Sequence, residues 1–74
     1  MQIYKDLDGD SSVVGYECGS DYIKVKFSSG AVYVYTYGSA GRDSVEKMKV
    51  LAMLGDGLNS FIMRFVKKNY AYAE

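Results

Sequence analysis

The sequence predicts an α+β domain in which a three-stranded antiparallel sheet is followed by two helices packed on one of its faces. Residues 22–27 alternate apolar and polar side chains, residues 31–37 combine valines with tyrosines, and residues 58–66 repeat apolar side chains at helical spacing. The first two patterns are typical of strands and the third of an amphipathic helix. Because the strands precede the helices, the helices must cover one sheet face to bury these apolar side chains.

The first part of the chain carries the weakest signals for regular structure. Residues 1–11 are predicted to be a leading loop or extension, because residues 5–12 are acidic and rich in turn-forming side chains. Residues 13–16 form the first predicted strand. The turn-forming residues 18–21 then lead into the second strand, residues 22–27.

The loop between the second and third strands sets their register. Residues 28–30, Ser-Ser-Gly, fit a three-residue hairpin loop whose last position takes the left-handed conformation that glycine adopts freely. A two-residue loop would shift the register by one residue and exchange the two faces of the third strand. The spacing alone allows both loops.

The three-residue loop turns Tyr33 and Tyr35 towards the helices, with Tyr35 opposite Ile23. Val32 and Val34 then face away from the helices, opposite the lysines of the second strand. On an uncovered face these two valines predict an apolar patch, which would bind a second copy of the chain or another protein.

Two helices are expected in the second half. The first begins at Asp43, which forms a capping-box pattern with Glu46, and continues to about Leu54. Gly55 ends it, and Asp56 is the expected N-cap of the second helix. The apolar stripe of that helix consists of Leu58, Phe61, Ile62, Phe65 and Val66.

Several short motifs together resemble a known family. They are residues 14–16, residues 23–30 with the hairpin glycine, Tyr33 and Tyr35 at a fixed distance from that glycine, and residues 57–62. The pattern is similar to that of the KTSC domain, a small module named for the C-terminus of some lysyl-tRNA synthetases. The family also occurs as stand-alone bacterial and phage proteins.

The KTSC resemblance covers about residues 11 to 70 and implies that residues 1–74 are a single domain. It favours the three-residue loop, because the family residue between the two tyrosines is often polar. RNA binding is the role usually suggested for the family. The chain departs from the family at Gly55, where serine is common, and in residues 38–42, where a valine-proline pair often opens the first helix.

The composition argues against an enzyme. The chain has no histidine, which is the commonest general base, and its single cysteine, Cys18, therefore lacks a partner that would activate it. Carboxylate pairs such as Asp43 and Glu46 are explained by helix capping. We therefore expect a non-enzymatic protein without a cofactor.

A metal site and a membrane span are also not expected. Asp6, Asp8, Asp10 and Glu17 have the spacing of four EF-hand ligands, but Ser11 stands where that loop requires glycine. No apolar run approaches the roughly 20 residues that span a bilayer. The expected location is the cytoplasm, in a bacterial host cell.

Positive side chains indicate where a phosphate could bind. Arg64, Lys67 and Lys68 lie at i, i+3 and i+4 of the second helix and would form a compact patch. Residues 38–42 lead into a helix N-terminus, whose N–H groups favour anions, and Arg42 would add a guanidinium. Each feature also has a structural explanation, since cations complement a helix C-terminus and the loop is an ordinary connection.

The leading functional hypothesis combines these cations with tyrosines. Tyr35 or Tyr37 would stack on or hydrogen-bond a base, and Asn59 would read a polar edge. The predicted partner is short single-stranded RNA or a small signalling nucleotide. A small phage protein could use such a site to sequester a signalling nucleotide from host defence.

The alternative hypothesis is a protein-interaction or assembly module that acts through Val32 and Val34. Its partner would be a host protein or another copy of the chain. A small domain without an internal disulfide often gains stability by self-association, so a homo-oligomer is expected under either hypothesis.

Overall fold

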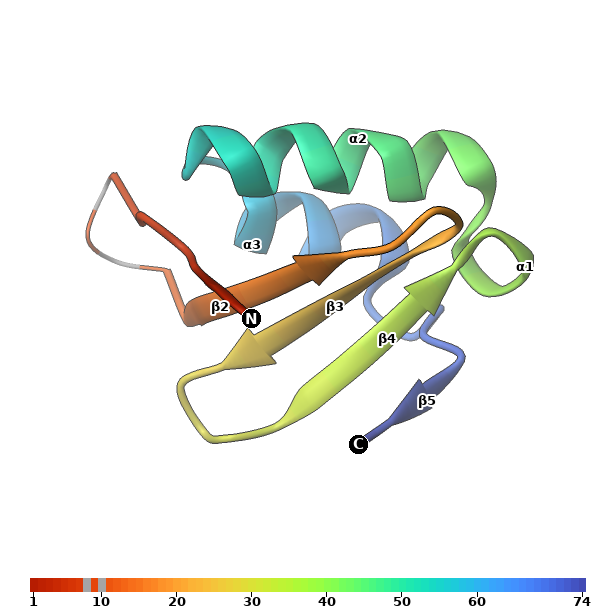
Figure 1. The fold of residues 1–74 in the computed structure, drawn as a ribbon, viewed down its shortest axis with the longest axis horizontal. Coiled ribbons are helices and arrows are strands. Elements are labelled where there is room, and N and C mark those ends of the chain that lie inside the picture. Colours follow the sequence, from red (N-terminus) through yellow and green to blue (C-terminus); the bar gives the residue numbers. More distant parts are fainter. Residues whose placement is uncertain (8, 10) are drawn as a thin grey trace.

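The structure is a computed structural model that describes residues 1–7, 9 and 11–74. Asp8 and Asp10, two of the residues in the EF-hand-like count, lie outside the described residues. A single antiparallel sheet forms one layer, and the helices form a second layer on one of its faces (Figure 1). The α+β class and the antiparallel sheet are therefore confirmed.

The described part of the chain contributes five strands, whose order in the sheet is the order in the sequence. Each strand pairs antiparallel with the next one. The strands are β1 (Gln2–Ile3), β2 (Val13–Cys18), β3 (Tyr22–Phe27), β4 (Val32–Thr36) and β5 (Tyr72–Ala73).

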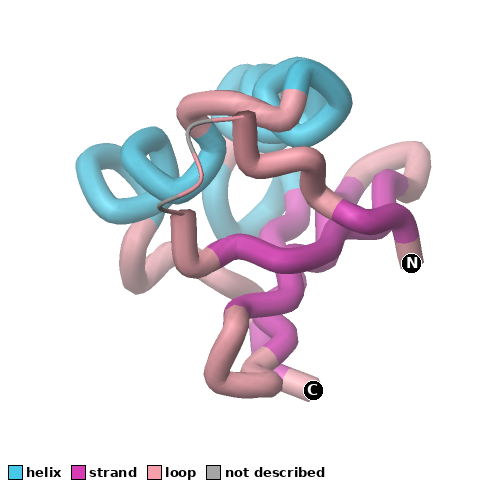
Figure 2. Tube along the Cα trace, turned by 90° about the vertical axis from the view of Figure 1, so that its left-hand side faces the viewer, coloured by secondary structure: helices cyan, strands magenta, loops and turns pink. Residues whose placement is uncertain are grey.

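The prediction of three strands is wrong, because each end of the chain adds a short edge strand. β1 pairs with β2, so residues 1–11 are more than a leading loop, and Tyr4 beyond β1 is only 5% exposed. β5 pairs with β4 at the other edge. The two termini lie at these opposite edges, on the strand side of the molecule (Figure 2). Strands of two residues are too short to show the alternation by which strands are predicted.

The predicted hairpin register is confirmed. Tyr35 pairs with Ile23 and Tyr33 with Val25. The loop that produces this register is closed by hydrogen bonds from the Gly30 N–H to the Phe27 carbonyl (2.9 Å) and from the Phe27 N–H to the Ala31 carbonyl (2.8 Å). Gly30 has φ +95°, a conformation that other residues rarely adopt.

The outward valines are placed on the predicted face, but they do not form the predicted exposed patch. Val34 pairs with Lys24 and lies outside the main core, yet it is only 2% exposed. Its other neighbour in the sheet is Tyr72 of β5. Because the C-terminal segment returns to this edge, Val34 is covered within the single chain, and Val32 is half-buried.

The first predicted helix is confirmed as α2 (Arg42–Leu54), but its start differs from the prediction. Its N-cap is Gly41, and Asp43 lies in the first turn. In the described residues a capping box is found instead at the preceding single turn, α1 (Tyr37–Ala40). There the Thr36 side chain accepts a hydrogen bond from the Ser39 backbone N–H, and the Ser39 side chain accepts one from the Thr36 backbone N–H.

Gly55 ends α2 as predicted, in the left-handed conformation with φ +78°. A Cβ atom at Gly55 would lie 2.6 Å from Cβ of Lys5, so the N-terminal segment also requires a glycine here. The left-handed conformation and the close approach of Lys5 therefore both favour glycine at position 55.

The second predicted helix begins at Leu58 but changes its winding. A turn of α-helix, α3 (Leu58–Phe61), continues into a π-helical segment, η1 (Ile62–Val66), and Gly57 rather than Asp56 is the N-cap. The wider π turn moves Phe65 off the buried stripe, and Phe65 is 62% exposed. Leu58, Ile62 and Val66 remain buried.

The core lies between the inner face of the sheet and the helices. Its members are each at most 5% exposed. They are Tyr4, Val13, Ile23, Val25 and Tyr35 from the sheet side and Val45, Met48, Ala52, Leu58, Ile62 and Val66 from the helices. At the hairpin end of the sheet, side chains of β3 and β4 and of the helical segment η1 line a cavity.

Candidate functional site

A cavity of about 420 Å³ opens where the β3–β4 hairpin meets the end of η1. We call it the tyrosine cavity. Its lining residues are Ser12, Phe27, Ser28, Ser29, Ala31, Tyr33, Tyr35, Met63, Lys67, Lys68 and Tyr70. Small-molecule sites commonly measure about 300–1,000 Å³, so the cavity is large enough for a small ligand.

The hairpin register positions two aromatic walls of the tyrosine cavity. Tyr33 and Tyr35 are neighbours on the inner face of β4, because side chains of a strand alternate between its faces. Phe27 ends β3 and contacts Tyr33 edge to face, with ring centroids 5.7 Å apart. A one-residue shift of register would remove both tyrosines from this face.

Tyr70 reaches the cavity because the segment after η1 turns back towards β4. The N–H of Ala71 donates to the Val34 carbonyl at 2.7 Å, which fixes the backbone next to Tyr70. The Tyr70 ring lies 4.6 Å from that of Tyr33 and 6.4 Å from that of Tyr35, measured between centroids. Three tyrosines from two separate segments therefore meet at one site.

Two of the three cations predicted on the second helix line the tyrosine cavity, and one does not. Lys67 and Lys68 follow η1 and are exposed at the cavity. Arg64 instead lies against the Phe65 ring, with its guanidinium carbon 5.6 Å from the centroid. The prediction of a single patch assumed α-helical spacing, and the π-helical winding of η1 changes that spacing.

Tyr35 is the most buried aromatic residue of the site. It is 1% exposed, and burial, reinforced by the nearby phenols of Tyr33 and Tyr70, raises the pKa of its hydroxyl to about 12. The phenol therefore stays protonated at neutral pH and can donate a hydrogen bond.

The predicted residues Tyr37 and Arg42 lie near the opposite end of β4, away from the tyrosine cavity. The Tyr37 hydroxyl oxygen is 2.6 Å from Oε2 of Glu46 and 3.1 Å from the Ser20 carbonyl oxygen. The hydrogen bond with Glu46 raises the pKa of Tyr37. Lys49 joins the same cluster, 2.8 Å from Oε2 of Glu46. These contacts tie α2 to the β2–β3 turn.

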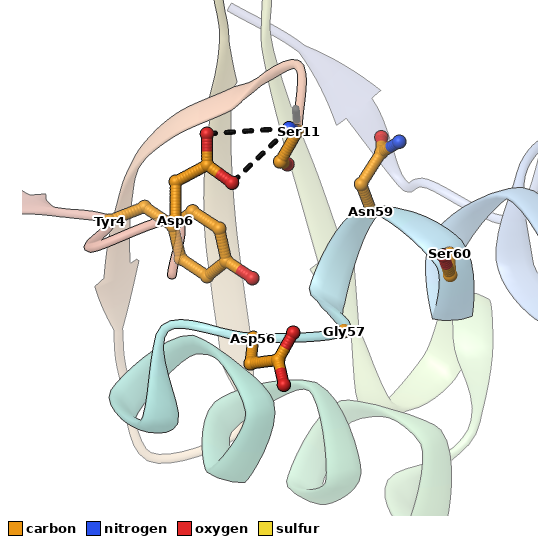
Figure 3. Close-up of a pocket in the computed structure, with 7 residues that line it drawn as sticks. All are labelled: Tyr4, Asp6, Ser11, Asp56, Gly57, Asn59 and Ser60. Atoms are coloured by element: carbon orange, nitrogen blue, oxygen red, sulfur yellow. Dashed lines mark hydrogen bonds between the residues drawn. The ribbon is translucent and has the colours of Figure 1, made fainter. Parts of the chain in front are cut away.

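Asn59 also lies outside the tyrosine cavity. Its Oδ1 accepts a hydrogen bond from the Ser12 hydroxyl at 3.0 Å, and it lines a second, smaller pocket of about 150 Å³ (Figure 3). That pocket also has two carboxylates, Asp6 and Asp56, which would repel a phosphate. The expected role of Asn59 beside a base is therefore not supported by its position.

The comparisons with known proteins give no identification. No family model, no curated protein and no solved structure matches the chain. The resemblance to KTSC domains stays a prediction.

Other site chemistries have little support in the described residues. No group of at least three histidine, cysteine, aspartate or glutamate side chains in residues 1–7, 9 and 11–74 could hold a metal ion. In the same ranges no helix is long and apolar enough to cross a membrane. Burial raises the pKa of the Cys18 thiol, which disfavours the reactive thiolate.

Sequence reasoning missed part of the tyrosine cavity. The sequence predicts only a turn at Ser28 and Ser29, and Met63 lies outside the predicted apolar stripe, so no local pattern indicates a binding role for these residues. Tyr70 follows the predicted apolar stripe of the second helix, and no local pattern places its ring. Its position against Tyr33 depends on the course of the C-terminal segment.

Proposed function

We propose that the protein binds a small nucleotide in the tyrosine cavity. The observation that supports this proposal is that one cavity of nucleotide-like size combines aromatic walls with two lysines. A base binds by stacking on aromatic rings, and a phosphate binds to lysine ammonium groups. Both parts of the ligand thus find a partner of suitable chemistry in one place.

In the proposed complex the phosphate lies against Lys67 and Lys68, where the hydroxyls of Ser28 and Ser29 add hydrogen-bond donors. The base packs among Phe27, Tyr33, Tyr70 and the thioether of Met63. Tyrosine rings are well suited to this contact because they have an apolar face and a polar tip.

The dimensions and the charge favour a small nucleotide over an RNA chain. Formal net charge is zero, and Arg64 and Arg42 do not continue the lysine pair along a groove. Binding of single-stranded RNA usually requires a positively charged track with several stacking platforms. A single cavity with two lysines fits one nucleotide unit better.

The interaction-module alternative has lost its main support. It depended on an exposed patch of Val32 and Val34, and Val34 is buried by the chain itself. The homo-oligomer stays a prediction.

The proposal is tested by titration calorimetry with the four ribonucleoside monophosphates, their cyclic forms and hexauridylate. We expect at least one small nucleotide to bind, with an affinity that falls as salt is added. Lys67→Ala with Lys68→Ala should weaken binding by about tenfold or more, since a hydrogen bond to a charged group contributes about 1.5–3 kcal/mol.

Lys47→Ala is the matched control, because Lys47 is an exposed lysine of α2 that does not line the cavity. It should leave the affinity unchanged. If only hexauridylate binds, the ligand is RNA. If no nucleotide or oligonucleotide binds to the folded protein, the proposed function is wrong.

A further inference from the structure

The hydroxyl of Tyr35 differs from that of Tyr4, the other buried tyrosine of the described residues, and from that of Tyr37. The Tyr4 hydroxyl accepts from the Leu58 N–H at 3.3 Å, and the Tyr37 hydroxyl contacts Glu46. Among the described residues, by contrast, the Tyr35 hydroxyl has no hydrogen-bond partner, although the residue is 1% exposed. A buried tyrosine hydroxyl normally has a partner, because an unmade hydrogen bond in the interior costs free energy.

The cavity accounts for this unpaired group. Every fully buried side-chain nitrogen or oxygen of the described residues has a hydrogen-bond partner. The Tyr35 hydroxyl has none, so it is not fully buried, and Tyr35 lines the tyrosine cavity. The small accessible part of this side chain is therefore its polar tip, at the inner wall of the cavity.

We propose that the Tyr35 hydroxyl donates a hydrogen bond to a ring nitrogen or an exocyclic oxygen of the bound base, and so makes the cavity specific for nucleotides with an intact base. The inference rests on the proposed function, because it assigns one contact within the same site. In this inference Lys67 and Lys68 bind the phosphate of the ligand, and Tyr35 contacts its base at the inner wall of the cavity.

Two properties of Tyr35 support this role. Its hydroxyl is held in place, since the ring is packed in the core and belongs to a strand that is paired on both sides. The hydroxyl is also protonated at neutral pH, because burial raises its pKa to about 12. A fixed donor at the inner wall of a cavity disfavours ligands that cannot accept its hydrogen bond.

The decisive variant is Tyr35→Phe, which removes one oxygen and keeps the ring. Its affinity for the nucleoside monophosphate that binds the wild type best should fall by about tenfold, because the variant loses one hydrogen bond to the base. Its affinity for ribose 5-phosphate, which has no base, should be unchanged. Tyr72→Phe is the control, because Tyr72 is 51% exposed and does not line the cavity.

Thermal unfolding of the unliganded protein gives a second, independent readout. If the hydroxyl has no protein partner, Tyr35→Phe should unfold at the same temperature as the wild type or at a higher one. A clear decrease would mean that the protein itself uses the hydroxyl, and the inference would be overturned.

The binding outcomes separate the two proposals. If Lys67→Ala weakens nucleotide binding but Tyr35→Phe does not, the proposed function stands and the role of Tyr35 is wrong. If Tyr35→Phe weakens ribose 5-phosphate as much as the nucleotide, the hydroxyl does not read the base. If the wild type binds no nucleotide, both proposals fail.

Discussion

At the scale of single residues, Gly30 decides which side chains reach the tyrosine cavity. Its positive φ closes a three-residue loop, and that loop sets the register that turns Tyr33 and Tyr35 inward. Apart from the two adjoining residues, no atom lies within 4 Å of a Cβ added at Gly30, so a substitution would be limited by backbone conformation and not by space. The residue therefore offers a direct test of the conformational argument.

Gly30→Ala should destabilise the protein by about 1–2 kcal/mol, the cost of a left-handed conformation for a residue with a side chain. Urea unfolding followed by circular dichroism measures this change. The control is Gly38→Ala, since Gly38 lies in a helical turn without positive φ and alanine favours a helix. Equal stability of Gly30→Ala and the wild type would contradict the proposed role of the turn.

Glu46 is a second residue whose environment predicts a measurable effect. Hydrogen bonds from Lys49 and from Tyr37 lower the pKa of its carboxyl from the ordinary value of 4.5. A carboxylate with a lowered folded-state pKa adds stability that is present above pH 4.5 and is lost as the pH falls through the lower folded-state value. Glu46→Gln should therefore lose less stability than the wild type between pH 5 and pH 3.

Thermal unfolding at a series of pH values tests this expectation for Glu46. Asp43→Asn provides the control, because Asp43 is exposed on the same helix and forms no ion pair with any described residue. If Glu46→Gln and the wild type show parallel pH profiles, the contacts with Tyr37 and Lys49 do not hold the carboxyl in its ionised form.

At the scale of elements, the second predicted helix shows how π-helical winding changes which of its side chains are buried. The apolar spacing predicted that Phe65 would be buried together with Ile62 and Val66. In the π-helical segment Ile62 and Val66 are buried, but Phe65 is exposed. A helix pattern in sequence assumes 3.6 residues per turn, and a π turn has no comparable signature. Arg64, which lies in the same π-helical segment, does not line the tyrosine cavity, whereas Lys67 and Lys68 do.

The π-helical assignment predicts unequal effects of two truncations. Ile62→Ala should destabilise the protein by about 2–5 kcal/mol, because it creates a cavity in the core. Phe65→Ala should cost less than about 1 kcal/mol, since Phe65 is exposed and packs mainly on Phe61. Denaturant unfolding of both variants distinguishes this arrangement from an α-helix, in which both losses would be large.

The elements that the sequence predicted well are those with a complete local signal. The strand of residues 22–27, the hairpin glycine and the glycine that ends α2 each carry their signal within a few residues. The edge strands depend instead on pairing between distant parts of the chain. The tyrosine cavity depends on such pairing too. The sequence predicted one ligand site that contains Tyr35, Lys67 and Lys68, and all three line the cavity. That predicted site also included Tyr37, Arg42, Asn59 and Arg64, which do not line the cavity.

At the scale of the whole molecule, β5 connects the fold to the candidate site. The Glu74 N–H donates to the Val32 carbonyl at 2.8 Å, and Lys24 pairs with the Glu74 carboxylate at 2.9 Å. This strand covers the edge of β4, and it holds the backbone from which Tyr70 enters the cavity. The C-terminal segment should therefore affect both stability and ligand binding.

Deletion of residues 71–74 should lower stability and weaken nucleotide binding together. The deletion removes the backbone hydrogen bonds to Val34 and Val32, which contribute about 0.5–1.5 kcal/mol each. It also releases Tyr70 from its place beside Tyr33. Denaturant unfolding and calorimetry with the best nucleotide measure the two effects.

Glu74→Gln separates the strand from its ion pair. The variant keeps the backbone of β5 and removes only the contact with Lys24, which is a partly exposed pair of the kind that contributes little. Its stability and affinity should therefore stay close to those of the wild type. If the deletion lowers stability but leaves nucleotide affinity unchanged, Tyr70 is not part of the binding site, and the ligand must contact β4 and the lysines alone.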